Sequence, residues 1–371
     1  MKITIFTSAL ILGGTERVAS NLANELVKNG HEVEILSLFH VDKPAYELDN
    51  RVSRYELTSD DGKAPNRFVG IYRHIKRYFA LIKYTRKSDT DKYLVMLRLP
   101  VYMLLSLKGI TFNSPVVFSE RGTPEETYAA SRMKKWISKR LLKRANGAVF
   151  QTDYALNYYS NEYLKCKGVV ILNPINEKLI EASTTASSSD YEERAFICVG
   201  RLTTQKNQKL LLKAFSLIHS KVPEYSLKLI GTGEDKSMLV ELSRDLGIID
   251  KVVFTGKLDN YKDIYRKGNI FVLSSLHEGL PNALIEAMVM GLPCVSTDCA
   301  GMGPRFLIED GINGFLVPLN NEVLMADRML ILTRDKQLAS TLGNNAKKLR
   351  EKVEPNLVFS QWIDYLLKVN R

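Results

Sequence analysis

Residues 195–208 read AFICVGRLTTQKNQ, and this stretch decides the fold. Residues 195–199 form an unbroken apolar run, which is typical of a short strand buried on both faces of a parallel sheet. A polar loop follows from Gly200, and a helical pattern begins near Lys209. A strand, a loop and a helix in this order form the repeating unit of a doubly wound α/β domain.

The same unit recurs in both halves of the chain. Before residue 180, strand-like segments alternate with helical patterns such as 15–28, and these segments are 3–6, 32–38, 93–97, 116–119, 148–151 and 169–172. After residue 194 the strand-like segments are 195–199, 226–230, 252–255, 270–273 and 293–296. This alternation predicts an α/β fold with two doubly wound parallel sheets.

The length of the chain also indicates two domains. Its 371 residues exceed the roughly 250 to 300 that one hydrophobic core supports. Residues 179–194 are the only low-complexity stretch and are rich in Ser and Thr, as linkers are. We therefore predict a first domain over 1–178, a linker over 179–194 and a second domain over 195–354.

Composition excludes several classes of protein. With 45% hydrophobic and 25% charged residues the chain is neither disordered nor fibrous. The four cysteines form no CxxC pair, so buried free thiols are expected instead of disulfides or a zinc site. The net charge is +11, and residues 1–180 carry +10 of it. Such asymmetry predicts an anionic partner for the first half: a nucleic acid, an anionic membrane or a phosphorylated substrate.

Two loops have the chemistry of anion-binding sites. Gly13 and Gly14 precede a helical pattern, so backbone N–H groups can approach a phosphate at a helix N-terminus, although a plain tight turn has the same sequence. In the loop after 195–199, Arg201 offers a rigid guanidinium and Lys206 a mobile ammonium. Together these two cations suit a diphosphate, and the alternative is a pair of solvated surface charges.

A third loop follows the strand-like segment 270–273 and reads SSLHEGLPNALIE over 274–286. Pro281 is a typical first residue of a helix, so Gly279 and Leu280 should expose unpaired N–H groups there. Glu278 and Glu286 are acceptor-only carboxylates that could bind hydroxyl groups of one ligand, such as a hexose and a ribose. Capping or surface glutamates are the alternative interpretation.

The order and spacing of these loops resemble a known family. The E-x7-E pattern from Glu278 to Glu286, the upstream Gly200-Arg201 and Lys206, and the segment 13–16 together resemble retaining glycosyltransferases of family 4, in particular bacterial enzymes that extend lipid-linked glycans. The resemblance spans nearly the whole chain. It implies the GT-B architecture, in which two Rossmann-like domains face each other across a cleft and a C-terminal helix, here 355–371, packs back on the first domain.

The resemblance also implies roles for single residues. Arg201 and Lys206 match the pair that binds the donor diphosphate and stabilises its departure, and Glu278 and Glu286 match the glutamates beside the transferred sugar and the ribose. Gly279 and Leu280 match donor-binding positions, and Gly13 and Gly14 match the loop over the donor phosphates. Glu120 and Arg121 lie in a segment, 119–124, that resembles the acceptor-side loop. The sequence departs from the family at Arg121, near which many members carry a histidine, and at Phe306, where relatives often have Glu.

The predicted activity is a retaining hexosyltransferase. It would move a hexose or an N-acetylhexosamine from a nucleotide sugar, a UDP-sugar by expectation, to a lipid-linked saccharide in bacterial surface polysaccharide biosynthesis, such as capsule or O-antigen. No cofactor and no metal are expected, because Arg201, Lys206 and a helix end can meet the charge of the leaving diphosphate, and Asp89-Thr90-Asp91 reads as a surface turn. A sugar-nucleotide epimerase or hydrolase on the same scaffold, and a basic nucleic-acid-binding protein, remain as alternatives.

The basic first half contains two amphipathic patterns. Residues 67–87 include seven Lys or Arg and no acid. On a helix one face would carry Ile71, Ile75, Tyr78, Phe79 and Ile82, and the opposite face Arg73, Lys76, Arg77, Lys83 and Lys87. A second basic stripe is Arg132, Lys135, Lys139 and Lys143, beside Trp136. These stripes predict a cytoplasmic protein peripherally associated with the anionic inner face of the cell membrane, with a solvated helix face as the alternative.

Overall fold

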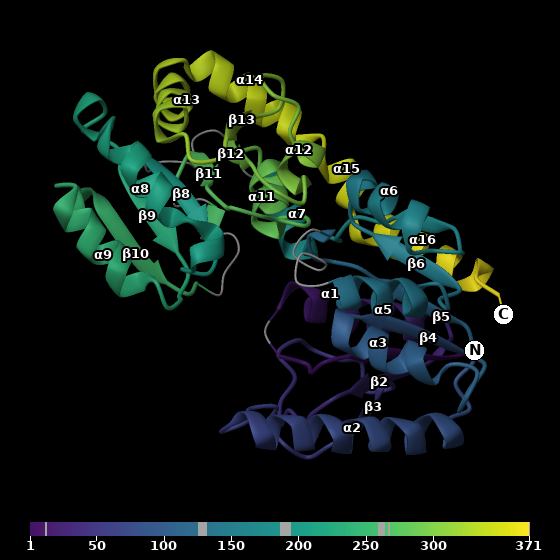
Figure 1. The fold of residues 1–371 in the computed structure, drawn as a ribbon. Coiled ribbons are helices and arrows are strands. Elements are labelled where there is room, and N and C mark those ends of the chain that lie inside the picture. Colours follow the sequence, from purple (N-terminus) through teal and green to yellow (C-terminus); the bar gives the residue numbers. More distant parts are fainter. Residues whose placement is uncertain (12, 125–131, 186–193, 259–263, 266–267, 371) are drawn as a thin grey trace. The chain divides into compact units, whose positions relative to one another are not determined.

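The computed structural model describes residues 1–11, 13–124, 132–185, 194–258, 264–265 and 268–370. The chain divides into two compact units, which are Met1–Asn173 together with Asn356–Arg371, and Pro174–Pro355. Each unit is built on its own parallel sheet (Figure 1). The predicted α/β class with two doubly wound sheets is therefore confirmed.

The first unit has a seven-stranded sheet in the order β3-β2-β1-β4-β5-β6-β7. Its strands are β1 Lys2–Thr7, β2 Glu32–Ser37, β3 Ser53–Glu56, β4 Lys92–Met96, β5 Val116–Ser119, β6 Gly147–Phe150 and β7 Gly168–Val170. The helices described in this unit are α1 Gly14–Lys28, α2 Arg67–Lys87, α3 Arg98–Leu107, α5 Arg132–Leu142, α6 Asp153–Glu162 and α16 Pro355–Lys368.

Alternate residues of the central strands point to opposite faces of this sheet, and each face has its own apolar cluster. Phe6, Val95 and Phe118 pack with α2, α3 and α6 on one face. Ile5, Leu94 and other alternate residues pack with α1 and α16 on the other. The reversal of strand order between β1 and β4 leaves an opening at the carboxyl edge of the sheet, where ligands of such folds bind.

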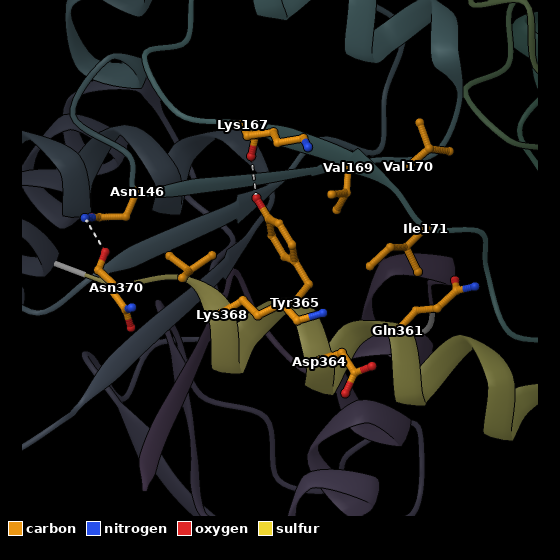
Figure 2. Close-up of a pocket in the computed structure, with 11 residues that line it drawn as sticks. Asn146, Lys167, Val169, Val170, Ile171, Gln361, Asp364, Tyr365, Lys368 and Asn370 are labelled. Carbon is orange, nitrogen blue, oxygen red and sulfur yellow. Dashed lines mark hydrogen bonds between the residues drawn. The ribbon is translucent and has the colours of Figure 1, made fainter.

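Helix α16 returns to the first unit and is fixed there by polar contacts. The Tyr365 hydroxyl donates to the carbonyl of Lys167 at 2.7 Å and accepts from the amide of Ala148 at 2.9 Å. The buried Lys92 ammonium donates to the carbonyl of Leu366. Beside Tyr365 an open pocket of about 590 Å³ lies between α16 and β7 (Figure 2). The Tyr365 hydroxyl, which makes two of these docking contacts, lines the pocket.

The second unit has a six-stranded sheet in the order β10-β9-β8-β11-β12-β13. Its strands are β8 Ala195–Val199, β9 Ser226–Ile230, β10 Val252–Gly256, β11 Ile270–Leu273, β12 Cys294–Asp298 and β13 Phe315–Pro318. The α-helices described here are α7 Glu177–Thr185, α8 Gln208–Ser216, α9 Lys236–Asp245, α11 Asn282–Val289, α12 Gly303–Leu307, α13 Glu322–Arg334, α14 Lys336–Lys347 and α15 Arg350–Val353. Helices α8 and α13 pack on one face of the sheet, and α11 contacts α7 and α14 on the other.

The region expected to be a linker is partly helical. Helix α7, Glu177–Thr185, overlaps the start of the segment 179–194 and contacts α11 of the second unit. Residues 186–193 lie outside the described part of the chain. The predicted first domain ended at residue 178, whereas the first compact unit ends at Asn173 before it resumes at Asn356.

The environment expected for Arg77 on α2 is wrong. Arg77, placed on the solvent face from the sequence, is buried, pairs with Asp60 and stacks over the ring of Phe39. Phe79, on the apolar face expected from the sequence, is 65% exposed. Leu81 and Tyr84 supply the buried face instead. We call the resulting exposed apolar surface the α2 stripe, which consists of Phe68, Ile71, Tyr72, Ile75 and Phe79.

Candidate active site

The main candidate site lies at the carboxyl edge of the second sheet. Strands β8 and β11 are neighbours at the point where the strand order reverses, and the loops that follow them carry five of the predicted site residues. The two loops are hydrogen-bonded to each other. Ser274 Oγ donates to the carbonyl of Lys206 at 2.9 Å, and the amide of Leu276 donates to the carbonyl of Gln205 at 2.9 Å. A parallel fold places functional loops at such a switch point.

Lys206 and Glu278, 72 residues apart in sequence, meet there as an ion pair. Lys206 Nζ lies 2.5 Å from Glu278 Oε1, and Ser275 Oγ donates to the same oxygen at 2.6 Å. The side chains are only 17% and 8% exposed, so the pair is partly withdrawn from water. The alternative of two solvated surface cations does not hold for Lys206. It is also less mobile than the sequence suggested, since Glu278 holds it.

Arg201 remains at the surface. Its guanidinium makes one long contact, at 3.4 Å, with Gln205 Oε1, and its carbonyl accepts from Gln208 Nε2 at 2.8 Å. The loop packs tightly against the loop that follows β9, where a Cβ on Gly231 would lie only 2.0 Å from the carbonyl oxygen of Gly200. The backbone of Arg201 is thus fixed while its charge stays accessible to a ligand.

Glu286 is the second buried glutamate of the E-x7-E pattern. It lies on α11, is 6% exposed, and accepts a 2.7 Å hydrogen bond from the hydroxyl of the fully buried Tyr265. Neither Glu278 nor Glu286 is a surface glutamate, so that alternative is wrong. Two buried carboxylates held by hydroxyl donors can accept ligand hydroxyls at fixed positions.

The start of α11 differs by one residue from the prediction. The helix begins at Asn282, and Pro281 is its N-cap with an extended ψ of 102° instead of its first helical residue. Gly279 and Leu280 therefore lie in the loop directly before the cap. This loop is closely packed, since a Cβ on Gly303 would lie 2.1 Å from the carbonyl oxygen of Gly279.

In the first unit, Gly13 is the N-cap of α1 and Gly14 is its first residue. The Tyr46 hydroxyl donates to the carbonyl of Gly13 at 2.9 Å. The carboxylate of Glu16 folds back over the cap, because a Cβ on Gly13 would lie 2.1 Å from Glu16 Oε2. A carboxylate thus already lies at the helix end where a phosphate was expected.

Glu120 and Arg121 follow β5 at the carboxyl edge of the first sheet. One Glu120 oxygen accepts from the amides of Arg121 and Gly122 at 3.1 and 3.0 Å, and the other accepts from the hydroxyl of Tyr159 at 3.0 Å. Glu120 therefore shapes the loop. Arg121 donates from Nη2 to Asn173 Oδ1, while its buried Nη1 has no hydrogen-bond partner.

No group of three or more His, Cys, Asp or Glu that could hold a metal occurs among the described residues. The four cysteines are free, as expected, and burial raises the pKa of Cys198 and of Cys299 to about 12. Asp89 pairs with Lys2 at 2.6 Å on the surface, in agreement with a surface turn. None of the helices in the described ranges is long and apolar enough to cross a bilayer.

Three functional candidates were not singled out from the sequence: Ser275, Tyr265 and Glu16. Ser275 stands in the quoted loop 274–286, and its spacing of three residues from Glu278 fits a local side-chain contact. Glu16 was quoted with its two glycines but was given no role. Tyr265 has no motif around it, so only the tertiary contact with Glu286 identifies it.

Family models match both halves of the chain. The model described as Glycosyltransferase Family 4 matches residues 12–179, and the model described as Glycosyl transferases group 1 matches residues 180–349. The boundary between the two matches is close to the boundary between the two compact units.

Relatives and solved structures agree over nearly the full length. A Campylobacter jejuni protein named GalNAc-alpha-(1->4)-GalNAc-alpha-(1->3)-diNAcBac-PP-undecaprenol alpha-1,4-N-acetyl-D-galactosaminyltransferase is 29% identical over 100% of this chain and 99% of its own. The amylovoran biosynthesis glycosyltransferase AmsD of Erwinia amylovora is 26% identical over 95% and 96%.

Among solved structures, sucrose-phosphate synthase from Thermosynechococcus elongatus superimposes with a TM-score of 0.83 at 18% identity, covering 99% of this chain and 98% of its own. Anabaena HepE in complex with UDP-glucose gives 0.78 at 17% identity, with 99% of each chain covered. These likenesses establish the GT-B fold, and with the two family models they show that the chain belongs to the glycosyltransferases with a family 4 N-terminal half and a group 1 C-terminal half.

Proposed function

We propose that this glycosyltransferase moves a hexose or an N-acetylhexosamine from a UDP-sugar to a lipid-linked saccharide, with retention of configuration, in bacterial surface glycan biosynthesis. The observation that carries the proposal is the meeting of Lys206 and Glu278 at the switch point of the second sheet, beside the exposed Arg201. The names of the relatives, which include an undecaprenol-linked acceptor and amylovoran, support the acceptor class. The UDP-glucose complex of HepE supports the donor class.

In this proposal the two cations meet the charge of the departing diphosphate. Arg201 is free to turn its guanidinium toward the phosphates, and Lys206 exchanges its Glu278 contact for a phosphate oxygen. Charge-assisted hydrogen bonds placed where negative charge develops are among the strongest contributions to catalysis. The N–H groups of Gly279 and Leu280, before α11, lie on the same side of the sheet as these loops.

The two buried glutamates then orient the donor. Glu278, once released by Lys206, accepts hydroxyl groups of the transferred sugar, and Glu286 accepts those of the ribose. Retention without a carboxylate nucleophile requires attack on the face that the diphosphate leaves, with the departing phosphate taking the acceptor proton. The charge of the leaving group is met by Arg201 and Lys206, so we propose that turnover needs no metal and persists in EDTA.

The α2 stripe supports a membrane-bound acceptor. Its exposed apolar residues share α2 with Lys76, Lys83 and Lys87, which are also exposed. Helices α3 and α5 follow on the same face of the first sheet (Figure 1), and α5 adds the exposed Trp136. An apolar stripe flanked by cations binds anionic headgroups and the acyl boundary below them, at about 1 kcal/mol per Lys or Arg near the surface.

Donor hydrolysis and transfer test the enzymatic part. The protein is incubated with a panel of sugar nucleotides, and nucleoside diphosphate release is followed with and without membrane-extracted polyprenyl-diphosphate saccharides. We expect acceptor-dependent release with a UDP-sugar, a product of unchanged anomeric configuration, and loss of turnover in Arg201→Ala. Release that ignores acceptor would instead favour a hydrolase, and near-normal turnover of Arg201→Ala would refute the site.

Co-sedimentation with vesicles tests the membrane part. Wild-type protein should bind phosphatidylglycerol vesicles at low salt and bind phosphatidylcholine vesicles poorly. The double variant Phe68→Asp with Phe79→Asp should lose binding, because both side chains are exposed and their replacement leaves the core intact. Val323→Asp, at a position 67% exposed on α13 of the second unit, is the matched control and should bind normally. Equal binding of all three proteins contradicts the proposal.

A further inference from the structure

The two oxygens of the Glu278 carboxylate have different surroundings. Oε1 accepts from Lys206 Nζ at 2.5 Å and from the Ser275 hydroxyl at 2.6 Å. Oε2 accepts no hydrogen bond from the described residues and keeps some contact with solvent. The protein therefore binds Oε1 and leaves Oε2 open to a hydroxyl group of a ligand.

Ser275 is held by contacts that do not involve the ion pair. It is fully buried, and its carbonyl accepts from the Thr297 hydroxyl at 2.6 Å, which ties it to β12. The amide of Glu278 donates to the carbonyl of Ala300 at 2.9 Å, just after the same strand. Both ends of the segment from Ser275 to Glu278 are thus fixed, so the hydroxyl stays near the carboxylate when Lys206 moves.

The proposed function requires such a movement, because Lys206 exchanges Glu278 for an oxygen of the departing diphosphate. Oε1 then loses its cation while the Glu278 side chain, 8% exposed, remains largely withdrawn from water. A buried carboxylate without a donor is unfavourable, so the exchange needs a second donor that stays behind. Among the described residues, Ser275 is the one that still donates to Oε1 after the exchange.

We propose that Ser275 is a positioning residue of the donor site, which holds Glu278 in place while Lys206 binds the diphosphate. The proposal rests on the proposed function and deepens it, because it names the group that allows Lys206 to leave. Ser275 acts through Glu278 and does not touch the donor. A neutral hydroxyl suits this role, since a second cation would itself be drawn to the phosphates.

Thermal unfolding of the full-length protein, followed by far-UV circular dichroism, tests this role without any ligand. Lys206→Met leaves Ser275 as the only donor to the Glu278 side chain among the described residues, and so imitates the state after the exchange. Ser275→Ala alone should lower Tm by about 2–4 °C, since Lys206 still pairs with the carboxylate. In the Lys206→Met background the same change should lower Tm at least about twice as much, because no donor remains.

Calorimetry with UDP tests the exchange itself. Ser275→Ala should weaken UDP binding about ten-fold, because the carboxylate has no donor once Lys206 turns to the phosphates. In a Glu278→Ala background the same change should alter UDP affinity by no more than about two-fold, since no carboxylate is left to hold. This dependence on Glu278 separates a positioning role from a merely structural one.

The matched control is Ser243→Ala on α9 of the second unit. Ser243 is also fully buried, but its hydroxyl donates to the neutral carbonyl of Leu239 at 2.7 Å. The control should leave UDP affinity within about two-fold of the wild type, and its effect on Tm should be the same with and without Lys206→Met. If Ser275→Ala does not fold, Ser275→Cys, which keeps a weak donor of similar size, replaces it in both measurements.

Three outcomes overturn the role of Ser275. These are an equal loss of Tm with and without Lys206, an unchanged UDP affinity in folded Ser275→Ala, and a loss of UDP affinity that persists in the Glu278→Ala background. Failure of the wild type to bind UDP refutes the UDP-sugar donor of the proposed function instead. The unfolding measurements then still decide whether Ser275 holds Glu278, because they use no ligand.

Discussion

Replacing Lys206 by Met should destabilise the second unit and spare the first. The change leaves the Glu278 carboxylate, 8% exposed, with the Ser275 hydroxyl at 2.6 Å and without its cation. Removing one partner of a buried pair costs about 3–5 kcal/mol, and the 17% exposure of Lys206 favours the low end, about 3 kcal/mol. In a unit of roughly 180 residues, each kcal/mol shifts Tm by about 2–4 °C, so Tm should fall by about 6–12 °C.

Neutralising the stranded acid should reverse most of that loss. In Lys206→Met with Glu278→Gln, the amide oxygen still accepts from Ser275 and no buried charge remains, so the double variant should lie within about 1 kcal/mol of the wild type. Transfer should remain abolished in both variants. Recovery of stability without recovery of turnover would separate the chemical role of the pair from its structural role.

The positions of the two tryptophans make the assay specific. Trp136 and Trp362 both belong to the first unit, so tryptophan fluorescence follows that unit and far-UV circular dichroism follows both. In Lys206→Met, the unfolding transition followed by circular dichroism should shift to lower temperature, and the one followed by tryptophan fluorescence should stay unchanged. Lys209→Met, at an exposed position on α8, is the control and should change stability by no more than about 0.5 kcal/mol. A shift below about 2 °C in Lys206→Met, or a double variant less stable than the single one, would refute the reasoning.

Three further changes have defined outcomes. Gly303→Ala places a Cβ 2.1 Å from the carbonyl oxygen of Gly279, so the loop before α11 must shift. UDP should then bind about ten-fold more weakly when measured by calorimetry. Unchanged affinity would show that this loop is not in the donor site. Tyr265→Phe removes the 2.7 Å bond to Glu286 and should raise the donor KM about five- to ten-fold with kcat nearly constant, and a loss confined to kcat would contradict a positioning role in donor binding. Glu16→Gln removes an acid whose pKa is raised above its ordinary 4.5 by burial. The folded protein holds that proton more tightly than the unfolded chain, so wild-type stability falls as pH rises from below 4.5 through the raised pKa, and the Tm advantage of the variant should grow between pH 4 and pH 7; a constant difference would contradict the shift.

The strands could be predicted wherever they are buried on both faces. The apolar run 195–199 became β8 with the same bounds, as did 226–230 and 270–273. Two strands were missed, β3 and β13. Strand β3 is an edge strand with mostly exposed polar residues, so it lacks the apolar pattern on which the prediction rests. Strand β13 has a short apolar run but ends in Pro318, a residue that argues against a strand.

Helical periodicity gave the right helix for α2 and the wrong environment for Arg77. The pattern contains two apolar arcs, and the sequence offers no local reason to prefer one of them as the core face. Asp60 and Phe39 decide it, because they bind and cover the guanidinium of Arg77, and both lie in segments outside the helix. Amphipathicity alone therefore identifies a helix surface but cannot say whether protein or another medium covers its apolar arc.

The location of the candidate sites followed from topology, whereas their detailed chemistry did not. Strand order alone brings Lys206 to Glu278 across 72 residues, so their proximity could be expected from the alternation of strands and helices. The contacts that hold the charges are different in kind. A hydroxyl from Tyr265 and an amide from Asn173 reach their partners only after the loops have packed, and no spacing in the sequence announces them.

Buried charge is the common property of the two candidate sites, and stability does not explain it. Replacing a buried ion pair by well-packed apolar residues often leaves the free energy of unfolding unchanged. The Lys206–Glu278 pair is therefore not needed for the stability of its unit. An orphaned donor such as Arg121 Nη1 is a net loss to the folded state by itself. Both features occur in loops at the carboxyl edge of a parallel sheet. Polar groups that cost stability at these loop positions are best explained by ligand binding. A sugar and its diphosphate need hydrogen-bond donors and acceptors that can exchange a protein partner for a ligand partner.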